Sequence, residues 1–256
     1  MRLNRIYEEI DKIAPFALSD EFCGKYGGHD NSGVLVDCGG EVEKILFSLD
    51  CSRFAVKRAE ETGANLIVTH HPVIFHPLSS LKAGDAVFEC VQAGISVISA
   101  HLNLDCAPGG IDDSLMFALG GEKAEKTAYP LSGGGYGKFF RIPSLSGEEF
   151  LARVQGSLET RRTVLYGGGG EVSSVASFCG AGMDEESLAF ALQCDADVLV
   201  SSDGKHHLIA QAVERGKSVL LLTHYAAENY GFRRFYQTIK KRVGLPCEFF
   251  ADGRFL

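Results

Sequence analysis

The sequence predicts an α/β protein with two similar lobes, each built on a mainly parallel sheet. Two apolar runs, at 65–69 and 218–223, have the length and the Val, Ile and Leu content of strands buried on both faces. Segments of helical pattern alternate with such strands, as in sheets covered by helices. Stretches of the two halves also match in the same order, 64–70 with 196–203 and 93–101 with 215–224. These short matches suggest a repeated lobe.

The elements follow from apolar patterning and from the residues that break it. An opening amphipathic helix over 3–13 should stop before Pro15, because the residue ahead of a proline is disfavoured in a helix. The first half is then expected to hold strands at 41–48, 65–69 and 96–100 and helices at 53–62, 86–93 and 112–119. The second half is expected to hold strands at 171–178, 198–201 and 218–223 and helices at 185–194, 207–215 and 227–243.

The glycine-rich stretches suggest where the lobes divide. Gly133–Gly135 and Gly167–Gly170 have the composition of turns. We therefore expect an amino-terminal lobe over 1–128, a linker or edge segment over 129–170, and a carboxyl-terminal lobe over 171–256.

Composition narrows the class of protein. Of the 256 residues 45% are hydrophobic and 23% charged, as in globular domains, and the net charge of −8 argues against a nucleic-acid partner. Eight scattered cysteines without a C-x-x-C pair indicate reduced thiols. The amino terminus lacks the apolar core of a signal peptide, and no apolar run is long enough to span a membrane. We expect a cytoplasmic protein without a membrane partner.

Metal-ligand side chains follow three of the expected strands. His70 and His71 end the first apolar run, His224 ends the second with Glu228 four residues later, and Asp105 follows the strand at 96–100. Open α/β sheets place their sites at the carboxyl ends of strands. Singly, each has a simpler explanation: surface histidines, an Asx turn, or a solvated glutamate at a helix start. Together, three imidazoles and two carboxylates suit two divalent metal ions and would leave positive charge for an anion.

Further residues are candidates for supporting roles. His101 lies four residues before Asp105, and Asp203, Lys205, His206 and His207 follow the strand at 198–201, where they could orient ligands or bind substrate. The turn Cys179-Gly180-Ala181-Gly182 is either an anion-binding nest or a tight strand–helix turn.

These residues resemble one protein family. His70-His71-Pro72, the stretch from Ser99 to Asp105 with Pro108-Gly109-Gly110, Asp203-x-Lys205-x-His207 and His224-Tyr225-Ala226-x-Glu228 are similar to motifs of the dinuclear metal-centre hexameric proteins. These are the NGG-interacting-factor-three-like proteins, also labelled GTP cyclohydrolase 1 type 2 homologues. The early segments Asp30–Gly33 and Leu49-Asp50 resemble its amino-terminal motifs.

The resemblance implies specific properties. It implies two α/β lobes with the metal site between them, the short form without an inserted domain, and a toroidal homo-hexamer. It makes His70, His71, Asp105, His224 and Glu228 the ligands of two metal ions, with Glu228 bridging. Leu102, Ala227 and Ser202 depart from the usual pattern, and none of them is an expected ligand.

The leading functional hypothesis is a metal-dependent hydrolase acting on a nucleotide or a related phosphorylated or heterocyclic, anionic substrate. His101 or His207 would move protons, since imidazole titrates near neutrality. The alternative is a non-enzymatic metal-binding or interaction scaffold, because a family label is not an argument about the site. Mixed histidine and carboxylate ligands suit Zn, Fe and Mn alike, so the metal stays open.

Overall fold

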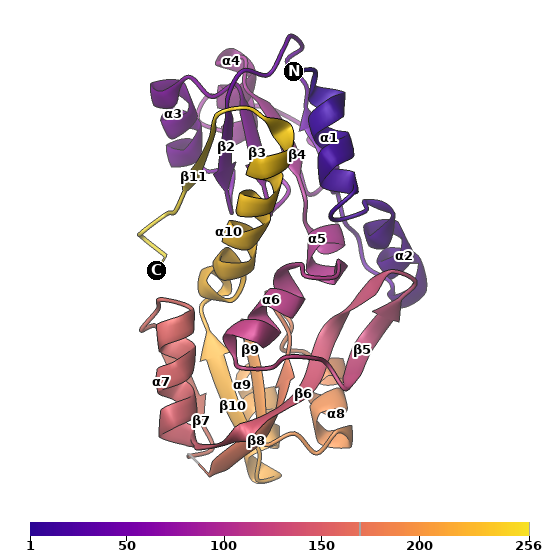
Figure 1. The fold of residues 1–256 in the computed structure, drawn as a ribbon, viewed down its shortest axis with the longest axis vertical. Coiled ribbons are helices and arrows are strands. Elements are labelled where there is room, and N and C mark those ends of the chain that lie inside the picture. The colour runs from indigo at the N-terminus through magenta and orange to yellow at the C-terminus, as the bar shows by residue number, and fades with distance from the viewer. Residues whose placement is uncertain (169, 256) are drawn as a thin grey trace. The chain divides into compact units, whose positions relative to one another are not determined.

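The chain folds into two compact units in the computed structural model, which describes residues 1–168 and 170–255 (Figure 1). Unit 1 comprises residues 1–107 and 232–252, and unit 2 comprises residues 108–231 and 253–256. The long helix α10 (His224–Val243) begins in unit 2 and ends in unit 1. Within the described residues, no helix is long and apolar enough to cross a lipid bilayer.

Unit 1 is a five-stranded sheet covered by helices. In spatial order its strands are β1 (Gly33–Val36), β4 (Ser96–Ser99), β3 (Leu66–Thr69), β2 (Ile45–Ser48) and β11 (Cys247–Phe250). All neighbours pair in parallel except β1, which runs antiparallel to β4. Its helices, besides the end of α10, are α1 (Leu3–Asp11), α2 (Ala17–Tyr26), α3 (Arg53–Thr62), α4 (Ala86–Gln92) and α5 (Leu102–Cys106).

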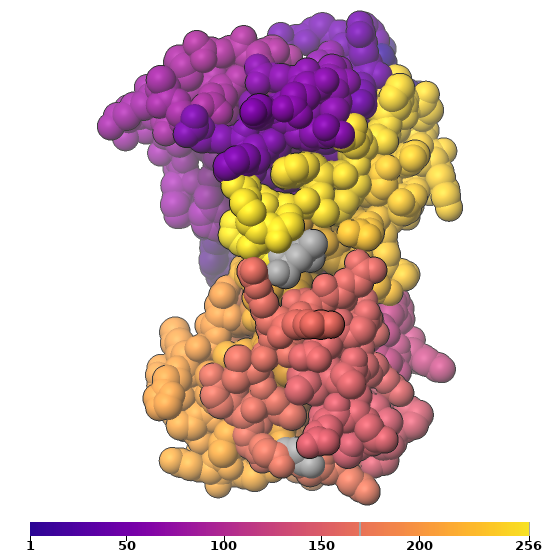
Figure 2. Space-filling view, turned by 90° about the vertical axis from the view of Figure 1, so that its left-hand side faces the viewer, coloured from indigo at the N-terminus to yellow at the C-terminus, as the bar shows by residue number. Residues whose placement is uncertain are grey.

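Both faces of this sheet are buried, which explains the continuous apolar runs of its strands. On one face Leu46, Ile67 and Val97 pack with side chains of α3 and α4. The alternate residues point to the other face, where the Phe47 ring lies 6.3 Å from that of Phe232, on the last part of α10. Figure 2 shows the carboxyl-terminal segment against the amino-terminal part of this unit, as the pairing of β11 with β2 requires.

Unit 2 is a six-stranded mixed sheet. In spatial order its strands are β5 (Lys126–Leu131), β6 (Gly134–Ser146), β8 (Glu171–Ser177), β9 (Val198–Ser202), β10 (Ser218–Leu222) and β7 (Thr163–Tyr166). The central strands β8, β9 and β10 are parallel, and the outer pairings are antiparallel. Its helices, besides the start of α10, are α6 (Ile111–Ala118), α7 (Gly147–Ser157), α8 (Glu185–Gln193) and α9 (His206–Glu214).

Helices cover the sheet of unit 2 as well. Phe178, Leu199 and Val219 form a buried cluster with apolar residues of α8 and α9. Residues that alternate with these along the strands, such as Val175 and Leu220, are also fully buried, and α6 and α7 contact β6 and β8. Alternation therefore buries both faces of the central strands.

The predicted α/β class with two lobes is confirmed, and parallel strands occupy the centre of each sheet. The lobe boundaries differ from the expected 1–128, 129–170 and 171–256. Residues 129–170 supply β6, α7 and β7, and β7 is an edge strand of the sheet, so this segment is part of unit 2 and is not a linker. The carboxyl-terminal segment returns to unit 1, because β11 adds a fifth strand beside β2.

Candidate metal centre

His70 and His71 extend from the carboxyl end of β3, between β4 and β2, whose carboxyl ends lie at the same edge of the sheet. The carbonyl of Leu49, just after β2, accepts hydrogen bonds from both backbone amides, at 3.1 and 3.0 Å. His70 is fully buried, and the His71 side chain keeps 24% of its surface exposed. The pair is thus fixed by the neighbouring strand at one end of the sheet.

Each histidine at this edge has its Nδ1 atom beside an acceptor. His70 Nδ1 lies 2.8 Å from the carbonyl oxygen of Ala100, and His71 Nδ1 lies 2.7 Å from Oδ1 of Asp50. A carbonyl oxygen can only accept a hydrogen bond, so Nδ1 of His70 carries the proton. An ionised carboxylate imposes the same tautomer on His71. In the neutral ring the lone pair is then on Nε2, the arrangement in which metal-binding histidines are usually held.

His101 is held in the same way from the next strand. It follows β4, and its Nδ1 lies 2.6 Å from Oδ1 of Asp30, just before β1. Because β1 runs antiparallel to β4, the start of β1 lies at the edge where β4 ends. The Ser32 hydroxyl accepts from the backbone amide of His101 at 3.1 Å, which fixes the backbone as well.

The three imidazoles converge. The ring centroid of His70 lies 4.9 Å from that of His71 and 5.1 Å from that of His101. One ligand atom from each of the three rings lies within 4.8 Å of the others. This is a geometry in which the histidines could hold a metal ion, so His101 is a further candidate ligand as well as a candidate proton carrier.

Asp30 illustrates the electrostatics of this edge. Burial by itself would raise the pKa of its carboxyl, but hydrogen bonds from His101, Ser19 and Ser32 and the positive charge that His101 can carry hold it well below the ordinary value. Asp30 is therefore an anion at neutral pH, and its negative charge is stabilised by three hydrogen-bond donors.

Asp105 brings a carboxylate to the histidines of unit 1. It lies on α5, a one-turn helix that starts after His101, and only 6% of its surface is exposed. Its Oδ1 atom lies 3.4 Å from Nε2 of His70. The simple Asx-turn explanation does not describe this residue, since its side chain is buried against an imidazole.

Unit 2 presents a second imidazole–carboxylate pair. His224 is the first residue of α10, so that Glu228, one turn later, shares its face: Nε2 of His224 lies 3.2 Å from Oε1 of Glu228. On the other side of the ring, Nδ1 lies 2.5 Å from Oδ2 of Asp203. Asp203 follows β9 with φ of 55°, a left-handed conformation that aspartate tolerates better than most residues. The turn after β9 thereby directs its carboxylate to His224.

Gly180 packs directly against Glu228. Its φ is 59°, and a Cβ atom added there would lie 2.5 Å from Oε1 of Glu228, closer than any real side chain approaches. The Gly180 carbonyl accepts hydrogen bonds from the hydroxyls of Ser201 and Ser202. The Cys179 amide donates to the buried carboxylate of Asp112 at 3.1 Å. The glycine turn is thus a fixed wall that leaves room for the glutamate.

The spacing within the two pairs fits metal ligation. Ligands about 2.1 Å from one tetrahedral or octahedral ion lie about 3.0 to 3.4 Å apart. The His70–Asp105 pair, at 3.4 Å, and the His224–Glu228 pair, at 3.2 Å, both lie in this range. The donor set of imidazole nitrogen and carboxylate oxygen suits Zn, Fe or Mn. These residues therefore fit divalent metal ions.

His207 lies apart from these contacts. It is exposed in the first turn of α9, and its side chain makes no hydrogen bond or ion pair with any described residue. The turn at 179–182 contacts Glu228 through Gly180. The sequence suggested either an anion-binding nest or a tight strand–helix turn here, and neither interpretation predicted this contact.

The sequence did not reveal the roles of Asp50 and Asp30. Asp50 follows β2, just as His70 and His71 follow β3. Its position at the carboxyl end of a predicted strand was therefore visible in the sequence. Asp30 precedes β1, which was not predicted, and its pairing with His101 spans 71 residues. Only the fold brings it there.

This chain is similar to known proteins in sequence and in fold over nearly its whole length. A GTP cyclohydrolase 1 type 2 homolog of Clostridium perfringens is 29% identical over 98% of this chain and 96% of its own length. Among solved structures, a hypothetical protein of Staphylococcus aureus has a TM-score of 0.84 at 23% identity, covering 98% of this chain and 97% of its own. Reduced HcgD of Methanocaldococcus jannaschii has a TM-score of 0.82 at 27% identity, covering 97% of both chains.

The match to a family extends over almost the whole sequence. Residues 1–252 match the Duf34/NIF3 (NGG1p interacting factor 3) family, in agreement with the resemblance of the histidine and carboxylate motifs. This protein belongs to the Duf34/NIF3 family.

Proposed function

We propose that this protein binds two divalent metal ions and is a metal-dependent hydrolase of a nucleotide or a related phosphorylated or heterocyclic compound. His70, His71, Asp105, His224 and Glu228 are the proposed ligands. The observation that carries the proposal is the orientation of the imidazoles: His70, His71 and His224 each have Nδ1 held by an acceptor, which leaves the lone pair on Nε2. Nε2 of His70 and of His224 also lies beside a carboxylate oxygen at ligand spacing.

Two bound ions would supply Lewis acidity, lowering the pKa of water and neutralising negative charge on the group under attack. The residues of the chain do the rest. Asp50 and Asp203 fix the tautomers of His71 and His224, and Gly180 keeps the Glu228 carboxylate facing the imidazole.

Proton transfer is assigned to His101. Its Nδ1 donates to Asp30, so that Nε2 can accept a proton and the carboxylate stabilises the imidazolium that forms. His207, which was the other candidate, is exposed on α9 and lacks such a partner among the described residues. His101 is therefore the better candidate for a general base.

A planar heterocycle as part of the substrate is supported by aromatic rings beside His101. The Phe75 ring stands perpendicular to that of His101, with centroids 6.1 Å apart, and 38% of its surface is exposed. The His29 and His76 rings stack nearby, at 5.3 Å. Exposed aromatic rings next to the proposed general base offer a stacking surface for a purine or pteridine-like ring.

The test is hydrolysis of a panel of nucleoside triphosphates, cyclic nucleotides and phosphodiesters by metal-loaded protein. We expect turnover of at least one class that disappears in Glu228→Gln and His101→Gln, with metal lost only in the first. Stoichiometric metal without turnover of any class would favour the scaffold alternative.

The family resemblance also supports a homo-hexamer, which we propose as the working assembly. Light scattering should then give a particle six times the 27.6 kDa mass of one chain. A monomer or a dimer at micromolar concentration would refute this assembly.

A further inference from the structure

The feature that the proposed function does not use is a pair of sulfur atoms in unit 1. The Sγ atoms of Cys51 and Cys90 lie 3.7 Å apart. Cys51 is in the connection between β2 and α3, while Cys90 is in α4 and fully buried in the apolar cluster under α3. The two residues are 39 positions apart in sequence, so tertiary packing places the sulfurs in contact.

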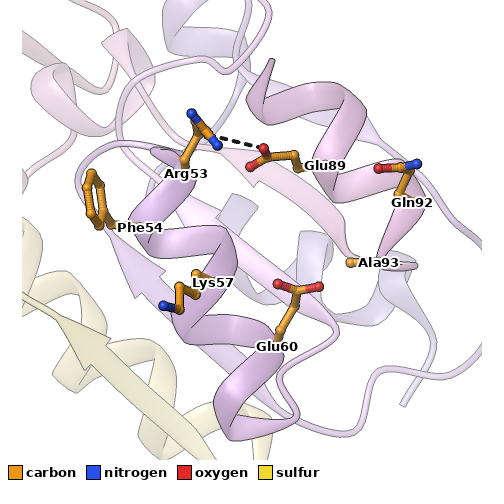
Figure 3. Close-up of a pocket in the computed structure, with 7 residues that line it drawn as sticks. All are labelled: Arg53, Phe54, Lys57, Glu60, Glu89, Gln92 and Ala93. Carbon is orange, nitrogen blue, oxygen red and sulfur yellow. Dashed lines mark hydrogen bonds and ion pairs between the residues drawn. The ribbon is translucent and has the colours of Figure 1, made fainter. Parts of the chain in front are cut away.

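The surroundings hold these sulfurs in place. Ser52, next to Cys51, caps α3 by accepting from the Ala55 amide at 3.2 Å. Arg53 and Glu89, each close to one of the cysteines, form an ion pair at 3.1 Å that joins α3 to α4 (Figure 3). Each sulfur is thus on an anchored segment, and a short approach of the two is enough for bonding.

We propose that Cys51 and Cys90 are a redox-active thiol pair that forms a reversible disulfide, and that the disulfide weakens the support of His71 through Asp50. A disulfide has a sulfur–sulfur distance of about 2.05 Å, so the sulfurs must approach by about 1.7 Å. Rotation about the side-chain bonds and a shift of the Cys51 connection accomplish this.

Exposure and acidity assign different roles to the two thiols. Cys51 is partly exposed, so a small oxidant can reach it, whereas Cys90 is buried. The hydrogen bond between the sulfurs raises the pKa of Cys51 and lowers that of Cys90, because a thiol that donates to its neighbour stabilises negative charge there. Cys90 therefore suits the second nucleophile, which closes the disulfide.

The oxidant is a peroxide. The Cys51 thiol passes its proton to the neighbouring Cys90 sulfur and attacks one oxygen of hydrogen peroxide. A sulfur–oxygen bond forms, the oxygen–oxygen bond breaks, and the hydroxide that leaves takes the proton from Cys90 and becomes water. The Cys90 thiolate then attacks the Cys51 sulfur, and a second hydroxide leaves as water. The two thiols lose two electrons and two protons in total, and one peroxide is reduced to two waters.

The effect reaches the histidines through the backbone. Asp50 directly precedes Cys51, and its carboxylate holds Nδ1 of His71 at 2.7 Å. Drawing residue 51 toward α4 displaces this carboxylate. The consequence for metal affinity rests on the proposed function, whereas formation of the disulfide does not.

The test uses the purified full-length chain, reduced and then treated with equimolar hydrogen peroxide. Remaining thiols are alkylated after unfolding, and the peptides are mapped by mass spectrometry. We expect a peptide pair joined through Cys51 and Cys90, lighter by two hydrogens and separated again by dithiothreitol. Cys90→Ala should abolish the link and leave Cys51 with added oxygen. Cys194→Ser is the matched control, because Cys194 is also partly exposed but makes no sulfur contact in the described residues.

Two outcomes would overturn the disulfide: Cys51 and Cys90 both alkylated as thiols, or Cys51 oxidised in the wild type without a link. The coupling to His71 is tested by chelator competition on protein loaded with Zn²⁺, which has no redox chemistry. Oxidation should weaken binding at least tenfold in the wild type and not in Cys90→Ala. A disulfide with unchanged Zn²⁺ affinity would refute the coupling alone, and a disulfide in a protein that binds no metal would instead refute the proposed function.

Discussion

Gly180 provides a sharp test of the ligand geometry, because a single methyl group at this position meets the Glu228 carboxylate. The substitution Gly180→Ala places Cβ 2.5 Å from Oε1, and ordinary contact begins near 3.4 Å, so the carboxylate must move by about 0.9 Å. Alanine at φ of 59° also costs about 1 kcal/mol of folding free energy, because a left-handed backbone is strained for any residue with a Cβ atom.

Gly216 supplies the matched control for the backbone cost. It has φ of 73°, and nothing lies within 4 Å of a Cβ added there. Gly216→Ala should therefore lower the free energy of unfolding by a similar amount, about 1 kcal/mol, without touching a proposed ligand. Urea unfolding of the two variants measures the loss of unfolding free energy that both should show.

The two variants should differ in metal affinity. A carboxylate displaced by nearly 1 Å no longer shares an ion well with His224, and we expect Gly180→Ala to bind Zn²⁺ or Mn²⁺ about 10- to 100-fold more weakly, about 1.4 to 2.7 kcal/mol. Gly216→Ala should stay within about twofold of the wild type. Chelator competition gives the dissociation constants. Equal affinities in the two variants would refute the placement of Glu228 as a ligand.

Three further predictions address other parts of the molecule. Asp50→Asn removes the charge that holds Nδ1 of His71 and should weaken metal binding about 10-fold in the same competition, with little effect on stability since the Asp50 side chain is 44% exposed. Burial alone would raise the pKa of Asp197, but hydrogen bonds from two serines hold it below its ordinary value. The stability that this charge contributes is therefore present above about pH 4 and lost as the pH falls through the folded-state value. Asp197→Asn should lower the free energy of unfolding at pH 7 by about 1 to 2 kcal/mol and leave it unchanged at about pH 2, a difference that urea titrations at both pH values would detect. Finally, Phe75→Leu should raise KM for a heterocyclic substrate more than it lowers kcat, and an unchanged KM would exclude stacking on this ring.

The elements predicted from sequence are those with strong apolar patterning. The helix over 53–62 was predicted with its observed bounds, and the central strands of both sheets were placed within one or two residues, with one exception. The strand predicted at 41–48 is a strand only over Ile45–Ser48, which is β2. Parallel strands buried on both faces give continuous apolar runs, which local patterning detects well.

The elements that were missed depend on contacts distant in sequence. β11 pairs with β2 some 200 residues away, and nothing in its own four residues indicates that partner. β6 contains Gly137, whose absent side chain leaves room for the Phe178 ring: a Cβ atom added at this glycine would lie 2.2 Å from the ring. Glycine inside a strand therefore marks close packing here, and Gly134 and Gly135, which the sequence assigned to a turn, are also part of β6.

The candidate site was also predictable only in part, because some of its residues meet only in the folded chain. Histidines and carboxylates at strand ends are visible in sequence, and the spacing of His224 and Glu228 gives the helical geometry directly once α10 begins at His224. The acceptors that fix each imidazole come from other strands, so Asp30 and Asp50 gain their roles only in the folded chain.

The most direct test of the proposed metal centre is the metal content of the protein itself. Elemental analysis should be made on untagged protein never exposed to chelator, beside His70→Ala and Glu228→Gln variants whose folding is checked by circular dichroism. We expect about two transition-metal ions per chain in the wild type and fewer in each variant. The absence of stoichiometric metal in the wild type, even after anaerobic reconstitution with Fe, Mn and Zn, would contradict a dinuclear centre.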